Sequence, residues 1–487
     1  MRIRIHQYEK TALLKELIDE FIPPGQYTLL EDEDGPDAGE AEDADRTGAD
    51  ADAGTAAEAE TDRVGEIRAD TDEDVLEINR AGSGDRDTIK REIFREMAAR
   101  TGKRPDWGIL TGVRPVKLAG ELLSEHQSDD AVRRILKNDF YLSDEKADLI
   151  IDMYHHQIDA IGEAAPGSAG IYVGIPFCPT RCLYCSFASN QVPDTEIEAY
   201  LPALHYEIEY CGRKLRENDT MIESFYIGGG TPTTLTAKQM DELLDTIRKH
   251  FDLEHVREFT VEAGRPDTIT PEKLRVLKEN GVDRISINPQ SMKQKTLDII
   301  GRSHTPEDII RAFETAKAES FDVINADLIA GLPEETPDDF KDTLEKILEL
   351  GAGNVTIHTL AVKRASRLIG IDSEYHYKAA GRVGEMLKWS RERLDQAGLL
   401  PYYLYRQKHM AGYFENTGYA VRGAEGIYNI RIMDEHQSIL ALGAGGISKR
   451  YFPESNRLVR VPNVTNYTEY IKRIEEMCMR KENKFFN

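Results

Sequence analysis

The chain has 487 residues, of which 40% are hydrophobic, so it is long enough for two or three domains with buried cores. Its formal net charge is −25, but residues 31–74 hold 19 acidic and 3 basic residues, so −16 of this charge lies in one segment and −9 in the rest. An acidic body argues against nucleic acid as the main partner, because phosphate binding requires a basic surface.

Neither a membrane span nor a secretion signal is indicated. No run of about 18 apolar residues occurs, and residues 1–17 contain no apolar run of the signal-peptide kind. Only five cysteines occur, three of them in one short motif, so the chain has no disulfide framework and suits a reducing compartment. We therefore expect a cytoplasmic protein.

Residues 1–30 and 75–160 predict an N-terminal domain that is mostly helical. Residues 1–6 read as a short strand that precedes an amphipathic helix, and residues 75–78 resume the same sheet. The acidic segment between them, residues 31–74, has almost no large apolar side chains to offset the entropy of ordering. We expect this insert to be disordered, as a solvated spacer rather than a functional tail.

Residues 107–117 combine a tryptophan, two glycines and two cations in one short stretch. This composition suits a docking or binding loop. A plain turn between helices, with Trp107 packed on the core, explains it equally well.

From residue 170 to about 360, short β-rich runs alternate with amphipathic helices. This alternation predicts parallel βαβ units and a partial (β/α)6 barrel, with its site at the carboxyl ends of the strands. The predicted strands are 171–175, 224–228, 257–263, 283–288, 322–330 and 354–360. The intervening helices are predicted at 194–212, 236–250, 271–280, 293–300, 306–318 and 337–350. Residues 374–487 predict a C-terminal α+β extension, so the fold class is α/β with a helical domain before the barrel.

Cys178, Cys182 and Cys185 directly follow the first predicted strand at C-x3-C-x2-C spacing. Three thiolates this close can hold an iron–sulfur cluster and leave one iron open to another ligand. A zinc knuckle needs a fourth ligand, and the next cysteine, Cys211, falls inside a predicted helix. A chance group of thiols is the other alternative.

Polar or glycine-rich segments lie at or near the ends of the second to fifth predicted strands. Parallel strands end at one edge of a sheet, so these segments point to one shared polar ligand. A charged residue in such a strand is costly unless it is paired or bound to a ligand. The segments are Gly228–Pro232, Val261–Ala263, Ser286–Gln290, Gly301–Ser303 and Asn325–Leu328.

Together, the Y-x-x-I-P-F-C-x3-C-x-Y-C loop, GGGTP, V-E-A, S-x-N-P-Q with an arginine twelve residues later, and D-L-I-x-G-L-P resemble one family. It is the oxygen-independent coproporphyrinogen III oxidase (coproporphyrinogen dehydrogenase) family of radical S-adenosylmethionine (SAM) enzymes. The branch with a long N-terminal extension is most similar, over roughly residues 170–450.

The resemblance implies a [4Fe–4S] cluster on Cys178, Cys182 and Cys185, with an open iron for SAM. A second SAM molecule is also implied. The implied SAM-pocket residues are Tyr172, Tyr184, Gly229, Gly230, Thr231, Glu262, Gln290, Arg302, Asp327 and Ala361.

The resemblance also implies the reaction and its partners. An external one-electron donor reduces the cluster, and the SAM-derived radical takes hydrogen from a substrate propionate. Loss of CO2 and of one electron to an acceptor leaves a vinyl group. Two such conversions turn coproporphyrinogen III into protoporphyrinogen IX.

Two positions depart from the family pattern: Gly174 replaces a usual histidine, and Phe187 replaces a cysteine that is not a cluster ligand. A substrate with four carboxylates also needs local cations, for which arginine is well suited. The candidates are Lys363, Arg364, Arg367, Arg406 and Lys408.

Three other functions stay open. A heme-delivery protein of the same family would need an axial ligand, for which His358 and His409 are candidates. A radical SAM enzyme with another substrate is the second, since fold alone does not define a substrate. A pure interaction protein is the third, and it would not need the complete set of pocket residues.

Overall fold

The computed structural model describes residues 2–5, 11–23, 26–30, 67–69, 75–78, 86–112, 114–187, 189–363, 366–372 and 374–487. They form two compact units. The first comprises Met1–Val113 and Ala119–Asp152, and the second comprises Arg114–Leu118 and Met153–Asn487. In the described part, no helix is both long and apolar enough to cross a membrane.

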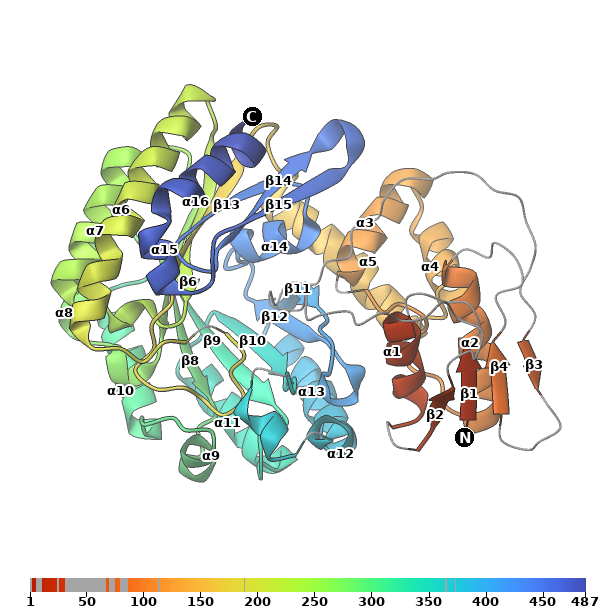
Figure 1. The fold of residues 1–487 in the computed structure, drawn as a ribbon. Coiled ribbons are helices and arrows are strands. Elements are labelled where there is room, and N and C mark those ends of the chain that lie inside the picture. Colours follow the sequence, from red (N-terminus) through yellow and green to blue (C-terminus); the bar gives the residue numbers. More distant parts are fainter. Residues whose placement is uncertain are drawn as a thin grey trace. The chain divides into compact units, whose positions relative to one another are not determined.

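The first unit contains a four-stranded sheet with helices packed beside it (Figure 1). The sheet order is β2-β1-β4-β3, where the strands are β1 (Arg2–Ile5), β2 (Thr28–Leu30), β3 (Ile67–Ala69) and β4 (Val75–Ile78). Strands β1 and β4 pair in parallel, which confirms that residues 75–78 resume the first sheet. Strand β3 lies inside the acidic segment 31–74, where we predicted disorder, and most of that segment is outside the described residues.

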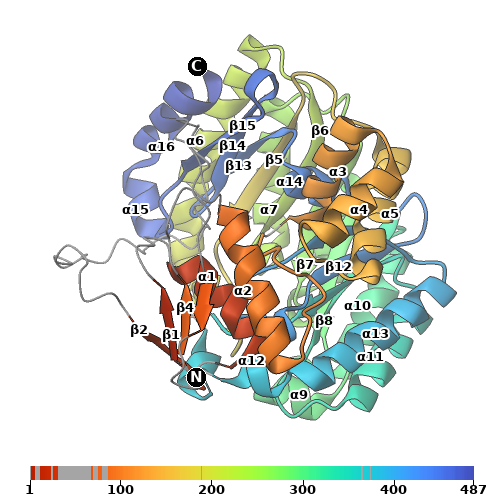
Figure 2. The same ribbon diagram turned by 90° about the vertical axis from the view of Figure 1, so that its right-hand side faces the viewer.

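Two helices complete the core of this unit, α1 (Thr11–Phe21) and α2 (Arg86–Thr101). Ile3 of β1 packs with Leu14 and Phe94 from these helices, and all three side chains are buried. Figure 2 shows both helices beside the sheet. The remaining helices are α3 (Pro115–His126), α4 (Asp129–Asn138) and α5 (Asp144–Ile161), of which α3 and α5 extend into both units.

The loop between α2 and α3 packs its tryptophan inward. Trp107 is 2% exposed, and the Lys146 ammonium lies over its ring, 5.4 Å from the centroid. The two cations of the loop, Arg114 and Lys117, form ion pairs with Glu435 at 3.1 and 3.6 Å. These contacts support the plain-turn interpretation.

The second unit is built on an eleven-stranded sheet whose centre is six parallel strands. The six strands are β5 (Ala169–Ile175), β6 (Ile222–Gly229), β7 (Glu258–Gly264), β8 (Arg284–Gln290), β9 (Val323–Ala330) and β10 (Asn354–Thr359). They lie in chain order across the sheet, so each predicted strand is confirmed to within a few residues. Their buried aliphatic residues fit a sheet that is covered rather than solvated.

Helices connect these strands and lie outside the sheet (Figure 1). They are α6 (Asp194–Glu217), α7 (Ala237–His250), α8 (Pro271–Glu279), α9 (Gln294–Ile299), α10 (Pro306–Ala318) and α11 (Pro337–Glu349). Threonine caps explain several starts. Thr236, Thr305 and Thr336 each form a capping box with the residue three positions later. In α10 and α11 a proline follows the cap, where its missing N–H costs nothing.

The C-terminal segment extends the same sheet at both edges. Strands β11 (Leu400–Tyr405) and β12 (Asn416–Ala420) join beyond β10, and β12 pairs with β10 in antiparallel. Strands β13 (Ser438–Leu442), β14 (Ile447–Phe452) and β15 (Arg457–Pro462) join beyond β5. The helices here are α12 (Tyr375–Lys378), α13 (Ala380–Gln396), α14 (Ile427–Asp434), α15 (Tyr467–Lys472) and α16 (Ile474–Lys481). Helices α15 and α16 lie beside α6 in Figures 1 and 2.

Candidate active site at the carboxyl ends of the parallel strands

The three motif cysteines and the ten predicted SAM-pocket residues all line one cavity of the second unit. The cavity has a volume of about 400 Å³, within the rough 300 to 1,000 Å³ range of small-molecule sites. Its walls come from the ends of β5 to β10 and from the loops that follow them, where the barrel prediction placed the site.

The cysteine loop is attached at both ends by backbone hydrogen bonds. The Thr231 N–H donates to the Phe177 carbonyl at 2.7 Å, and the Leu183 N–H donates to the Ile300 carbonyl at 3.0 Å. Between these anchors, the Thr231 hydroxyl lies 3.6 Å from the Cys178 sulfur and donates to it. The loop is therefore held against the GGGTP segment on one side and the Arg302 segment on the other.

The donor set suits an iron–sulfur cluster better than a single ion. Among the described residues, no three His, Cys, Asp or Glu side chains lie close enough together to hold one metal ion. A cluster needs a wider spacing, because each thiolate binds a different iron. Burial raises the pKa of the Cys178 thiol to about 11, so a metal partner is needed to favour its thiolate at neutral pH.

Gly230 lies against the cysteine loop. A Cβ atom there would lie 2.5 Å from the Phe177 carbonyl oxygen and 2.9 Å from the Cys178 sulfur. Any larger residue would displace the loop, so glycine is required by close approach.

Glu262 on β7 accepts a 2.6 Å hydrogen bond from the Tyr226 hydroxyl on β6. Burial raises the pKa of Glu262 to about 7, although this hydrogen bond lowers it. The nearby Asp327 carboxylate adds repulsion that also raises the pKa. A cationic group of a ligand would favour the ionised carboxylate here.

Gln290 and Arg302 carry buried polar atoms that point to a ligand. Gln290 is 6% exposed, and its Oε1 has no hydrogen-bond donor among the described residues. Its backbone has φ of 67°, a left-handed conformation that costs energy for glutamine. Arg302 donates to the Asn288 carbonyl at 2.8 Å and to the Tyr184 hydroxyl at 2.9 Å, while its Nε finds no acceptor in the described part of the chain. Unpaired buried groups are rare and suit a ligand of matching polarity.

A row of polar side chains lines the pocket across β9 and β10. The Asn325 amide donates to the Asp327 carboxylate at 2.8 Å, and Asp327 lies 3.5 Å from His358 Nε2. The other imidazole nitrogen, Nδ1, lies 3.4 Å from the Tyr405 hydroxyl. This side of the cavity can offer several hydrogen bonds to a second molecule.

Several lining residues were absent from the sequence-based set. Asn288 and Asn325 lie within the strand-end segments that the sequence singled out, so polarity alone could have included them. Others come from the C-terminal segment, from strand β6 or from the residue directly after β7, where periodicity carries no such signal. These are Tyr226, Arg265, Tyr403, Tyr405, Gln407, Asn416 and Asn429.

The structure places the candidate cations differently relative to the cavity. Lys363 lines the cavity, whereas Arg367, Arg406 and Lys408 are not among its described lining residues, and Arg364 lies outside the described residues. Arg406 is 6% exposed and donates to the Tyr413 carbonyl, so the fold uses it internally. His358 lines the cavity, but His409 does not.

The two departures from the family pattern have different surroundings. The Gly174 carbonyl accepts a 2.9 Å hydrogen bond from Tyr200, and its missing side chain would contact the Tyr172 ring at 3.3 Å. Phe187 lines the mouth of the cavity and is 68% exposed. The glycine-rich stretch 443–446 is a turn between β13 and β14, outside the described pocket lining.

The chain is similar to three groups of known proteins. The radical SAM superfamily matches residues 172–347. The oxygen-independent coproporphyrinogen-III oxidase-like protein HemZ of Bacillus subtilis is 40% identical over 401 residues, which cover 80% of this chain and 79% of that protein. The heme chaperone HemW of Bacillus subtilis is 29% identical over 303 residues, which cover 62% of this chain and 75% of that protein.

Among solved structures, coproporphyrinogen III oxidase (HemN) from Escherichia coli matches 64% of this chain and 70% of its own, with 22% identity and a TM-score of 0.49. The extent of the match to HemZ defines the family by itself. The chain therefore belongs to the oxygen-independent coproporphyrinogen-III oxidase-like family of the radical SAM superfamily.

Proposed function

We propose that this chain is a radical SAM enzyme that converts two propionate side chains of coproporphyrinogen III into vinyl groups, giving protoporphyrinogen IX. The observation that supports it most is the cavity, since all thirteen residues assigned to the cluster and to SAM line it. The 40% identity to an oxidase-like relative supports the substrate class.

In this proposal Cys178, Cys182 and Cys185 hold a [4Fe–4S] cluster, and the ten SAM-pocket residues hold SAM. Binding of a second SAM molecule is also part of the proposal. When bound, these cofactors supply an electron and a carbon-centred radical that removes hydrogen from the substrate. The unpaired Gln290 Oε1 and Arg302 Nε suit a donor and an acceptor of SAM. Glu262 suits its cationic part.

The substrate would occupy the side of the cavity formed by Asn325, His358, Tyr403 and Tyr405. There Lys363 supplies a cation for a carboxylate, and the hydroxyl and amide groups supply neutral donors. Each propionate would lose one hydrogen atom, one CO2 and one electron, so an external electron donor and an acceptor are both part of the proposal.

A heme-binding protein is the second candidate. His358 lies in the cavity and is a possible axial ligand, and heme chaperones are among the relatives. Its neighbours Asp327 and Tyr405 are close enough to engage the imidazole instead, which favours a structural or substrate-binding role for His358.

The test is an anaerobic assay of the reconstituted protein with dithionite, SAM and, in separate reactions, coproporphyrinogen III and hemin. We expect 5′-deoxyadenosine to accumulate with coproporphyrinogen III, and to be lost in Cys182→Ala but kept in Cys478→Ala, whose thiol is buried outside the motif. Stoichiometric hemin binding without SAM cleavage would favour the second candidate. SAM cleavage that leaves coproporphyrinogen III intact would indicate another substrate.

A further inference from the structure

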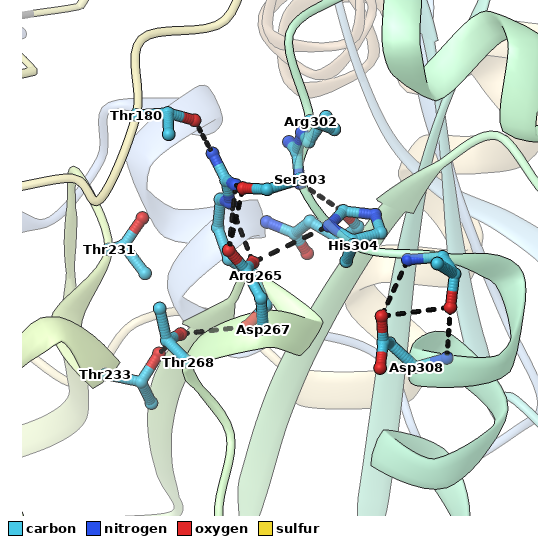
Figure 3. Close-up of polar contacts among 12 residues, drawn as sticks. Thr180, Thr231, Thr233, Arg265, Asp267, Thr268, Arg302, Ser303, His304 and Asp308 are labelled. Atoms are coloured by element: carbon cyan, nitrogen blue, oxygen red, sulfur yellow. Dashed lines mark hydrogen bonds and ion pairs between the residues drawn. The ribbon is translucent and has the colours of Figure 1, made fainter.

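Arg265 is a buried cation at the edge of the cavity, and each of the three nitrogens of its guanidinium donates a hydrogen bond. It is 3% exposed and lies directly after β7. Its guanidinium donates to both oxygens of Asp267, at 3.0 and 2.9 Å, and to the Ser303 hydroxyl at 2.9 Å. Its remaining nitrogen donates to the Thr180 hydroxyl (Figure 3). This geometry fixes the orientation of the guanidinium.

Thr180 is the point where this arrangement reaches the cluster loop. It lies midway between Cys178 and Cys182, and its hydroxyl accepts from Arg265 and donates to the Gly301 carbonyl at 3.1 Å. The next residue, Arg302, lines the SAM side of the cavity. One guanidinium therefore connects three loops: the cysteine loop, the segment after β7, and the segment that carries Arg302.

Asp267 is itself held on its other side. His304 is fully buried, and its Nδ1 lies 3.6 Å from the Asp267 carboxylate (Figure 3). Ser303 also donates to Asp267 at 3.2 Å. The neighbouring guanidinium and imidazole hold the pKa of Asp267 well below its usual range, although burial opposes this. The carboxylate thus stays charged and keeps Arg265 aligned.

A buried ion pair contributes little net stability compared with apolar packing, so stability alone does not account for this pair. Its place beside the cysteine loop suggests a reason. Arg265 also lines the same cavity as the three cysteines, so its positive charge lies near the thiols.

We propose that Arg265 is a positioning residue for the iron–sulfur cluster: through Thr180 it holds the cysteine loop in register with the Arg302 segment, and with Asp267 it sets the electrostatic field at the cluster. This inference rests on the proposed function, because it assumes that the three cysteines bind the cluster and that SAM binds beside it.

The experiment compares the full-length protein with Thr180→Val, Thr180→Ser, Arg265→Lys, Arg265→Gln and Asp267→Asn. The matched control is Arg393→Gln, which removes a bidentate guanidinium–carboxylate pair with Glu345 between helices α13 and α11. Neither residue is among the described residues that line the cavity. After anaerobic reconstitution we would measure iron and sulfide content, the SAM dissociation constant, the reduction potential of the cluster by EPR-monitored titration, and the melting temperature of the apoprotein.

Thr180→Val and Arg265→Lys should raise the SAM dissociation constant about tenfold, the effect of one lost hydrogen bond to a charged group, with apoprotein melting close to the parent for Thr180→Val. Thr180→Ser should keep the parental affinity for SAM, because serine retains the hydroxyl group. Arg265→Gln should lower the reduction potential, because Asp267 is left uncompensated, and Asp267→Asn should raise it. Arg393→Gln should change neither SAM affinity nor potential.

The failures of the two proposals are distinguishable. A parent protein that takes up no cluster contradicts the proposed function. The alternative outcome is a parent protein that binds both the cluster and SAM. If Thr180→Val and Arg265→Lys then match Arg393→Gln in SAM affinity and in cluster reduction potential, the role of Arg265 is overturned. If Arg265→Gln does not fold, the comparison of SAM affinity between Thr180→Val and Thr180→Ser still tests the role of Arg265. Both variants keep the buried ion pair between Arg265 and Asp267.

Discussion

The Tyr226 hydroxyl and the Glu262 carboxylate form a 2.6 Å hydrogen bond inside the cavity, between neighbouring strands β6 and β7. Burial nevertheless raises the pKa of Glu262 from 4.5 to about 7. The folded protein therefore favours the protonated acid. This contribution to stability is complete below pH 4.5 and is lost as the pH rises through 7.

Glu262→Gln tests this directly, because glutamine is neutral at every pH. From pH 4.5 to 8, the free energy of unfolding of the parent should fall relative to that of Glu262→Gln, by about 3 kcal/mol at most. Urea denaturation of both apoproteins across this range measures the difference. A difference independent of pH would show that Glu262 ionises normally.

Tyr226→Phe should shift the same transition upward. The lost hydrogen bond is one that lowers the pKa of Glu262, so its removal leaves burial less opposed. The stability contributed by protonated Glu262 should then be lost at a pH above 7. SAM affinity near pH 7 should fall, because less of the Glu262 carboxylate is ionised. An unchanged transition would mean that the hydroxyl does not act on this carboxylate.

Gly230→Ala should disturb the cysteine loop. The added methyl group would meet the Phe177 carbonyl and the Cys178 sulfur at 2.5 and 2.9 Å, and relieving such contacts costs about 1–3 kcal/mol. We expect a lower apoprotein melting temperature and less iron bound after reconstitution. Gly381→Ala in α13 is the control, since its Cβ would meet nothing within 4 Å and alanine favours a helix by about 0.5–1 kcal/mol. Equal iron contents in the two variants would contradict the argument.

Lys481→Met should destabilise the second unit strongly. Lys481 and Glu207 form a 2.6 Å ion pair in which both side chains are fully buried, and Tyr470 also donates to Glu207. Removing the lysine leaves a buried carboxylate uncompensated, which costs about 3–5 kcal/mol.

The control for this pair is Lys472→Met, which removes a 3.0 Å pair with Glu469 whose side chains are 68% and 46% exposed. It should cost less than about 1 kcal/mol. Thermal unfolding of both apoproteins measures the contrast, and similar melting temperatures would show that the buried pair is not important for stability.

His358→Ala separates the two candidate functions. The decarboxylase account predicts that hemin affinity is unaffected by this substitution, because His358 is engaged by Asp327 and Tyr405 rather than available to iron. Loss of the Soret shift on hemin titration would instead identify His358 as an axial ligand. His409→Ala is the matched control, since His409 does not line the described cavity.

The sequence predicted the six parallel strands because each pairs apolar β-rich residues with a following amphipathic helix. It also predicted that the strand-end segments share one site, because parallel strands end at one edge, whereas the individual pocket residues came from the family resemblance. The same reasoning could not predict Tyr403, Tyr405 and Asn416. They lie at the cavity because β12 pairs in antiparallel with β10 and β11, and periodicity does not specify this pairing.

The cations illustrate the same limit. Arg406 follows a strand and is one of the candidate cations for a substrate carboxylate, yet it is buried and donates to the Tyr413 carbonyl. The role of Arg265 depends on contacts with Thr180 and Ser303, 85 and 38 residues away in the chain, which no local pattern indicates.

The most direct test of the central claim is the product ratio under nitrogen. The reconstituted protein would be incubated with dithionite, SAM and coproporphyrinogen III, and protoporphyrin (after oxidation) and 5′-deoxyadenosine would be quantified together. One hydrogen atom is removed per propionate, so the account predicts about two molecules of 5′-deoxyadenosine per protoporphyrin, and neither product in Cys182→Ala. A cluster-loaded protein that forms no protoporphyrin would contradict it.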